Sequence, residues 1–372
     1  MQRNASKLAA LAAVAIASLV YSGVRGEARQ APQQGGGGGR GAAPAAAPAD
    51  VELHILHVQG NVHMLVGAGG NIALQIGDDG VLLVDTGLAA NAEKVVAAVR
   101  TISNKPIRYI VNTHVHPDHV GGNDFIGKLG STIAGGNVGA GAGVGAGIIA
   151  HENVLNRMSA PTGQQAPFPT TAWPTDTYIS KQKELFFNGE SLQIIHQPAA
   201  HTDGDSIVYF RKSDVIVAGD LFVTTTYPFI DSARGGNITG IIAALNNMLD
   251  IAIPKAMQEG GTYIIPGHGR LTDEADLLEY RDMITIIRDR IDAMIKKGMT
   301  LPQINRAAPT SDYDGRYGTM SGVWTTDMFV EAAYRTTTVD DPESLLTRFM
   351  TSSHFRREVD ASKWNPRPCK PA

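Results

Sequence analysis

The segment from residue 113 to residue 122 reads THVHPDHVGG, and it is the most informative stretch of the chain. It follows an apolar run that is typical of a buried strand. Because alternate side chains of an extended segment point the same way, His114 and His116 can bind one ion. Asp118 and His119 come at a predicted helix start, where they can bind a second ion. Neutral imidazoles and carboxylates are the ligands that divalent metals such as zinc prefer.

Three later residues extend this set, and each comes just past a predicted strand. His201 lies in a turn, Asp220 follows a Val/Ile run, and His268 follows Pro-Gly at the end of an apolar run. We expect these strand ends to place their side chains at one shared site. The sequence therefore predicts seven metal ligands, namely His114, His116, Asp118, His119, His201, Asp220 and His268.

The pattern of apolar residues mixes antiparallel strand runs with strand–helix units. Such a mixture predicts an α+β fold of two packed sheets with helices outside. Strands are expected at residues 51–58, 61–66, 71–76, 81–84, 107–111, 148–151, 192–196, 206–210, 215–218 and 263–265. Helices are expected at residues 89–102, 238–253 and 274–297.

The first 49 residues are predicted to lie outside the folded domain. Residues 1–26 have basic residues, an apolar run too short for a comfortable membrane span, and small residues after it, which indicates a signal peptide. The chain is then exported, to a periplasmic or secreted location, and has no stable membrane span once the signal is removed. Residues 27–49 are rich in Gly, Ala and Pro and are predicted to form a flexible linker.

The rest of the chain divides into a main domain over residues 50–300 and a C-terminal extension over residues 301–372. The extension is expected to pack on the domain, with a helix near 343–349. The Gly-rich segment 135–147 does not fit a phosphate-binding motif in any register, so we expect a mobile loop there.

Composition excludes some partners and leaves others open. The 372 residues carry a formal net charge of −4, which argues against a nucleic-acid partner and favours a small-molecule substrate. The single cysteine, Cys369, cannot form an internal disulfide. The oligomeric state is not indicated by the sequence.

Five more side chains have alternative interpretations that the sequence does not separate. Tyr227 and Phe229 either line a substrate pocket or belong to a packed loop, and Trp173 either acts as a lid or packs in its Pro-rich loop. His151 and His196 lie at strand ends, where they are either structural residues or partners of the metal ligands.

With these motifs in order, the chain resembles the metallo-β-lactamase fold superfamily over roughly residues 50–300. The resemblance implies a four-layer αββα sandwich. It also implies that Asp85 supports the metal loops from behind the ligands. The implied ligands of the first metal are His114, His116 and His201, those of the second are Asp118, His119 and His268, and Asp220 bridges the two.

The details of the motif distinguish among branches of that superfamily. A bridging Asp220 resembles glyoxalase II and general metallohydrolases, whereas many β-lactamases of this fold lack it. Members with a cysteine ligand are excluded because Cys369 is the only cysteine. His116, where a glutamate would stand, argues against di-iron flavoproteins. The acidic balance argues against RNA-processing members, and the chain length argues against the larger alkylsulfatases.

The resemblance implies a hydrolase that holds two Zn²⁺, although the same ligands accept iron or manganese. A metal-bridging hydroxide would attack an acyl carbonyl of an ester, thioester, lactone or amide. Asp118 is the expected catalytic residue, which orients the water or takes its proton. Three alternatives stay open: a β-lactamase, an iron-dependent sulfur dioxygenase, and a metal-binding protein without catalytic activity.

Overall fold

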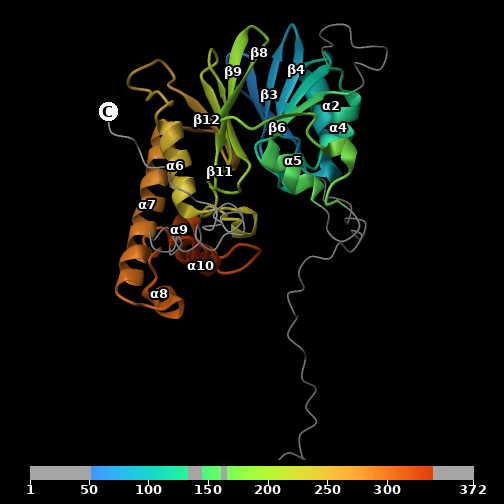
Figure 1. Cartoon of the computed structure of the whole chain (residues 1–372). Coiled ribbons are helices and arrows are strands. Elements are labelled where there is room, and N and C mark those ends of the chain that lie inside the picture. The colour runs from blue at the N-terminus through green and yellow to red at the C-terminus, as the bar shows by residue number, and fades with distance from the viewer. Residues whose placement is uncertain (1–51, 133–144, 161–165, 338–372) are drawn as a thin grey trace, which may run out of the picture. The chain divides into compact units, whose positions relative to one another are not determined.

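The computed structural model describes residues 52–132, 145–160 and 166–337 (Figure 1). Several sequence expectations lie outside these residues. They are the signal peptide at 1–26, the linker at 27–49, most of the Gly-rich segment, and the helix near 343–349.

The first sheet has seven strands in the order of the sequence. Pairing is antiparallel from β1 to β4 and parallel from β4 to β7. The strands are β1 (His54–Gln59), β2 (Val62–Val66), β3 (Ile72–Gly77), β4 (Gly80–Val84), β5 (Ile107–Val111), β6 (Gly147–His151) and β7 (Asp176–Tyr178).

The second sheet has six strands in the order β13-β12-β11-β10-β9-β8. Only the β11–β12 pair is parallel. The strands are β8 (Gln182–Phe187), β9 (Glu190–Gln197), β10 (Asp205–Phe210), β11 (Val215–Val223), β12 (Tyr263–His268) and β13 (Thr272–Asp273).

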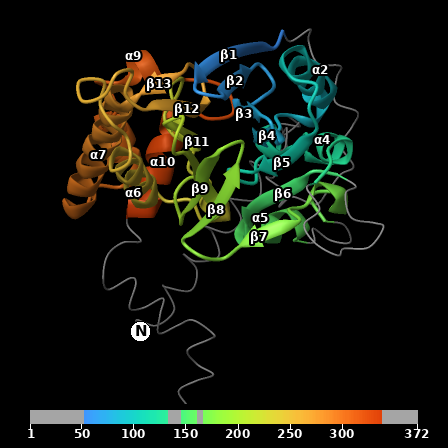
Figure 2. The same ribbon diagram turned by 90° about the horizontal axis from the view of Figure 1, so that it is seen from above.

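Helices cover the outer faces of both sheets, so the chain forms the four-layer αββα sandwich that the sequence predicted (Figures 1 and 2). Strand β4 shows why the layers hold together. Leu82 and Val84 point into the core between the sheets, while Val81 and Leu83 point into the core under the helices. A strand buried on both faces is apolar throughout, as this one is.

The helices on the first sheet are shorter than those on the second. They are α2 (Ala92–Ile102), α3 (Pro117–Val120), α4 (Asn123–Leu129) and α5 (Glu152–Ser159). On the second sheet lie α6 (Ile238–Leu249) and α7 (Glu274–Lys296). Asn237 and Asp273 cap α6 and α7 by accepting hydrogen bonds from backbone N–H groups two and three residues on.

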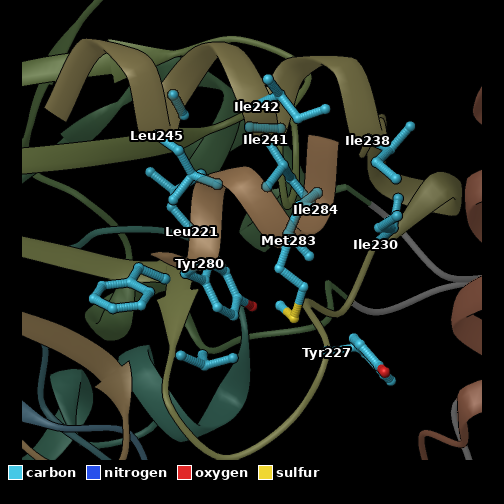
Figure 3. Packing of buried hydrophobic residues seen from close by; sticks show 14 of the residues in the cluster. Leu221, Tyr227, Ile230, Ile238, Ile241, Ile242, Leu245, Tyr280, Met283 and Ile284 are labelled. Atoms are coloured by element: carbon cyan, nitrogen blue, oxygen red, sulfur yellow. The ribbon is translucent and has the colours of Figure 1, made fainter. Parts of the chain in front are cut away.

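Figure 3 shows the core between α6 and α7. Ile238, Ile241 and Leu245 recur at helical spacing on α6 and pack with Tyr280 and Ile284 of α7. Within the expected C-terminal extension, the structure describes three more helices. They are α8 (Leu301–Ala307), α9 (Asp314–Tyr317) and α10 (Thr326–Thr337). Phe329 and Val330 of α10 join the same buried cluster.

The strand and helix positions agree with the pattern of apolar residues, with three kinds of difference. The predicted helix 238–253 ends at Leu249, and Pro254 accounts for part of this because it disfavours helix in the residue before it. Strands β11 and β12 run several residues beyond their predicted ends. Short elements such as β7 and β8 were not predicted, because pairing rather than composition holds them in the sheet. No helix of the described residues is long and apolar enough to cross a membrane.

Replacing Phe329 tests whether α10 is part of the folded core. Its side chain is 0 % exposed, so Phe329→Ala should lower the free energy of unfolding by about 3–5 kcal/mol. The neighbouring Met328 is 44 % exposed, and Met328→Ala should change it by less than about 0.5 kcal/mol. Urea denaturation measures both. Equal, small effects would show that α10 does not pack as described.

Candidate metal centre

The seven predicted ligands come from loops and strand ends that meet at one place. His114 and His116 follow β5, and Asp118 and His119 lie on the short helix α3. The other three come from the second sheet: His201 lies between β9 and β10, Asp220 lies within β11, and His268 is the last residue of β12.

Asp220 and His268 therefore belong to strands, whereas the sequence placed them just past strand ends. The β11–β12 register shifts on both sides of Gly219. Gly219 has a φ of 55°, and a Cβ there would lie 2.8 Å from Thr113 Oγ1. Only glycine suits this close approach, and the irregularity it allows precedes Asp220 directly.

The donor atoms form two clusters. In each cluster, one donor atom per residue lies within 4.8 Å of the others. The first cluster contains His114, His116, His201 and Asp220, and the second contains Asp118, His119 and His268.

Asp220 faces both clusters with different oxygen atoms. Its Oδ2 lies 3.9 Å from His114 Nε2 and 3.7 Å from His201 Nε2. Its Oδ1 lies 3.1 Å from His119 Nε2 and 3.4 Å from His268 Nε2. The carboxylate is thus placed between the two sets of imidazoles, as a bridging ligand would be.

In the first cluster, His116 and His201 use their outer nitrogens to hydrogen-bond the loop after β11. His116 Nε2 donates to Asp231 Oδ2 at 2.9 Å, and His201 Nδ1 donates to the Phe229 carbonyl at 2.6 Å. Both acceptors lack protons to give, so each ring carries its proton on the outer nitrogen. The inner nitrogens then keep their lone pairs.

In the second cluster, Asp85 performs the same role for His119. Asp85 Oδ2 accepts from His119 Nδ1 at 2.7 Å, and its carboxylate also accepts from the Thr113 backbone N–H and hydroxyl. Thr113 Oγ1 lies 3.0 Å from His114 Nδ1. Asp85 has a φ of 65°, in the left-handed region that Asp and Asn enter more readily than other non-glycine residues.

Two observations indicate that these residues fit bound metal. The inner nitrogens of His116 and His201 lie 2.8 Å apart although both outer nitrogens are donors, so two lone pairs face each other. His114 Nε2, His119 Nε2 and Asp220 Oδ1 are buried and make no hydrogen bond among the described residues. Buried polar atoms are rarely left in this state without a bound partner.

The pKa values of the histidines also differ between the two clusters. Burial lowers the pKa of His201 to about 4 and holds that of His114 well below its usual range, so both rings are neutral and ready to bind. Burial also acts to lower the pKa of His268, but Asp118 and Asp220 outweigh it and raise the value to about 9. The carboxylates of Asp220 and Asp85 likewise raise the pKa of His119 against burial. An incoming ion would therefore displace protons from these two rings.

A cavity of about 370 Å³ lies against the second-sheet side of the centre. Asp220 and His268 line it together with the side chains Val223, Thr225, Thr226, Phe229, Val323 and Trp324. Among these described residues none is a lysine or an arginine, and the surface that they present to the cavity is mainly apolar. Its volume lies in the range of small-molecule sites.

The other candidate residues divide between the cavity and the core. Phe229 lines the cavity, whereas Tyr227 is buried and stacks on Phe329, so its loop is packed. Trp173 donates its indole N–H to the Phe168 carbonyl and packs with a small apolar cluster. The sequence did not indicate Asp231 or Trp324, because neither belongs to a motif.

His151 and His196 stack on each other, with ring centroids 3.6 Å apart. His151 Nδ1 accepts the Asn153 backbone N–H and so caps α5, and His196 Nε2 bonds the Asp203 carbonyl. Of the two open interpretations, these contacts favour the structural one.

The comparisons with known proteins agree with this two-sheet sandwich with converging imidazoles and carboxylates. The model of the Metallo-beta-lactamase superfamily matches residues 65–268. The chain belongs to this superfamily.

Two curated proteins also match the chain in sequence. A linear primary-alkylsulfatase from Pseudomonas sp. (strain ATCC 19151) is 27 % identical over 254 residues, which is 60 % of this chain and 46 % of the relative. A beta-lactamase-like protein 2 homolog from Caenorhabditis elegans is 23 % identical over 196 residues, covering 52 % of this chain and 53 % of the relative. The chain spans about half the length of the curated relatives it matches.

Among solved structures, the stereoselective inverting sec-alkylsulfatase Pisa1 from Pseudomonas sp. superposes with a TM-score of 0.53 at 16 % identity. The match covers 85 % of this chain and 52 % of that one, and it shows a shared fold. The chain length argued against the larger alkylsulfatases, but a linear primary-alkylsulfatase is among the proteins that the chain resembles in sequence.

Removing the charge of Asp231 tests whether its hydrogen bond to His116 prepares that ring for metal binding. Asp231→Asn can present an amide N–H to Nε2, which would move the ring proton to Nδ1, where the metal is expected. We expect metal affinity to fall by about 10–100-fold, as for other partners of metal-bound histidine. Chelator competition measures it. Arg234, the other partner of Asp231, is 48 % exposed, and Arg234→Gln should have little effect. Equal affinity in the wild type and Asp231→Asn would contradict this role.

The stacked histidines predict a pH dependence of stability. Burial, and then His196, lower the pKa of His151 from 6.5 to about 4 in the folded state. Below pH 6.5 the unfolded chain therefore binds more protons, so stability is lost as the pH falls from 6.5 towards 4. His151→Asn keeps a capping acceptor but does not titrate. Urea denaturation of metal-free protein should show the stability difference between wild type and variant shrinking over this range. A constant difference would contradict the assignment.

Proposed function

We propose that the protein is a dinuclear zinc-dependent hydrolase that cleaves an acyl substrate, an ester, thioester, lactone or amide. The observation that carries the proposal is the convergence of seven buried or half-buried donor atoms in two clusters that share Asp220. The ligands are all nitrogen and oxygen atoms, which suits zinc and also accepts iron or manganese.

When bound, two divalent ions would lower the pKa of a water molecule towards about 7 and polarise the substrate carbonyl. The chain's own residues perform the other tasks. Asp220 sets the spacing of the clusters through its two oxygens. Asp118 is 31 % exposed, and its Oδ2 lies 3.2 Å from His268 Nε2. It is the most open carboxylate of the centre, so we assign it the orientation of the water and the acceptance of its proton.

The leader-like pattern of residues 1–26 supports a further proposal, that the chain is exported and acts in the periplasm or outside the cell.

Sulfate-ester hydrolysis is the second candidate, because a curated relative is described as a linear primary-alkylsulfatase. The cavity favours the acyl substrate over this one. A sulfate ester carries a negative charge, and among the described residues that line the cavity none is a lysine or an arginine.

The test is hydrolysis by purified, zinc-loaded protein of p-nitrophenyl esters, a thioester, a lactone, nitrocefin and hexyl sulfate. We expect turnover of acyl substrates that a chelator abolishes and zinc restores, with two zinc ions per chain by elemental analysis. His116→Ala and Asp118→Ala should each lower kcat/KM by more than about 100-fold, because each removes a ligand.

Circular dichroism controls for folding of both variants. Full activity in either folded variant would overturn the assigned centre. Turnover of hexyl sulfate alone would replace the acyl function by the second candidate, and turnover of nitrocefin alone would make the protein a β-lactamase.

A further inference from the structure

The cavity beside the metal centre is closed partly by residues far along the chain. Val323 and Trp324 come from the segment between α9 and α10, beyond the residues that the family model matches. The segment is fixed at its base, because the Thr319 N–H bonds Thr326 Oγ1 at 3.0 Å and the Thr326 N–H bonds the Thr319 carbonyl at 2.9 Å. These two bonds close the backbone of the segment at its base.

The side chains of Trp324 and Phe229 together form one wall of the cavity. Their rings meet edge to face with centroids 4.6 Å apart. Phe229 in turn lies against His116 and His201, with ring centroids 5.6 Å from each. Val323 also lines the cavity and is 95 % exposed, so it stands at the mouth. An apolar surface thus runs from the mouth to the metal ligands.

The loop that carries Phe229 is held by the same C-terminal helices. Tyr227 stacks on Phe329 of α10 with ring centroids 4.7 Å apart, and its hydroxyl donates to Asp314 Oδ1 at 2.8 Å. Tyr227 and Ile230 both belong to the cluster drawn in Figure 3. Both sides of the wall are therefore anchored to one buried core.

We propose that Trp324 determines substrate specificity and that the substrate is a neutral ester, thioester or lactone with an apolar acyl chain of several carbons. The acyl chain lies against Phe229, Val323 and Trp324. This inference rests on the proposed acyl-hydrolase function, but it concerns binding, which can be measured separately.

The kinetic test uses zinc-loaded full-length protein with p-nitrophenyl acetate, butyrate and octanoate. Each methylene that the cavity accepts should raise kcat/KM about fourfold. Trp324→Ala should lower the octanoate-to-acetate ratio by at least about tenfold, because it removes the wall. Trp324→Phe keeps an aromatic ring at this position, so it should preserve much of the ratio.

Met320→Ala is the matched control. Met320 lies in the same segment, is 91 % exposed, and does not line the cavity. It should leave the chain-length dependence unchanged. Thermal unfolding confirms that all variants are folded.

The binding test uses 2-nonanone, a neutral ketone that cannot be hydrolysed, with 2-butanone as the short comparison. Calorimetry should show 2-nonanone binding to metal-free and zinc-loaded protein, at least about tenfold weaker in Trp324→Ala and unchanged in Met320→Ala. If 2-nonanone binds in this way but no acyl substrate is hydrolysed, the cavity assignment is supported and the reaction is wrong. If esters are hydrolysed without chain-length preference, or if Trp324→Ala binds 2-nonanone like the wild type, the specificity assignment is wrong.

Discussion

The rest of the structure depends on the carboxylate of Asp220, which lies between two sets of imidazoles inside the protein. Its two oxygens face different clusters, and the side chain is only 12 % exposed. A carboxylate in this position is costly unless positive charge surrounds it. The sandwich meets this requirement by bringing loops of both sheets to one place, and every ligand loop is positioned with respect to this residue.

Hydrogen bonds behind the ligands keep the rings in place. Asp85 and Asp231 each hold one imidazole, in different clusters. Asp85 also accepts from the Thr113 N–H in the segment after β5, and Asp231 accepts from the Arg234 N–H in its own loop. Asp231 and the carbonyl of Phe229 belong to one loop, and that loop is fixed by Tyr227 against the C-terminal helices. The metal centre, the cavity wall and the packing of α10 are thus parts of one connected arrangement.

The sequence predicted the layers of the fold and the candidate ligand residues, because both depend on the local pattern of residue types. Alternation of apolar residues indicates burial, and the close spacing of His114, His116, Asp118 and His119 indicates a candidate metal site. Asp231 and Trp324 could not be predicted in this way. Their roles depend on loops whose course is set by contacts with Tyr227 and Phe329, which lie about a hundred residues apart in the chain. The extended ends of β11 and β12 likewise depend on pairing around Gly219.

The charges around the centre limit the substrates that it suits. Asp118 and Asp220 supply negative charge among the imidazoles, and the carboxylates behind His116 and His119 supply more. Together they offset much of the positive charge that two divalent ions would bring, and Arg234 in turn pairs with Asp231. The surface of the adjoining cavity is mainly apolar, with Phe229 and Trp324 among its lining residues. Under the proposed function, apolar burial would be the main force that holds a substrate there, and a neutral acyl compound would meet that condition better than a charged ester.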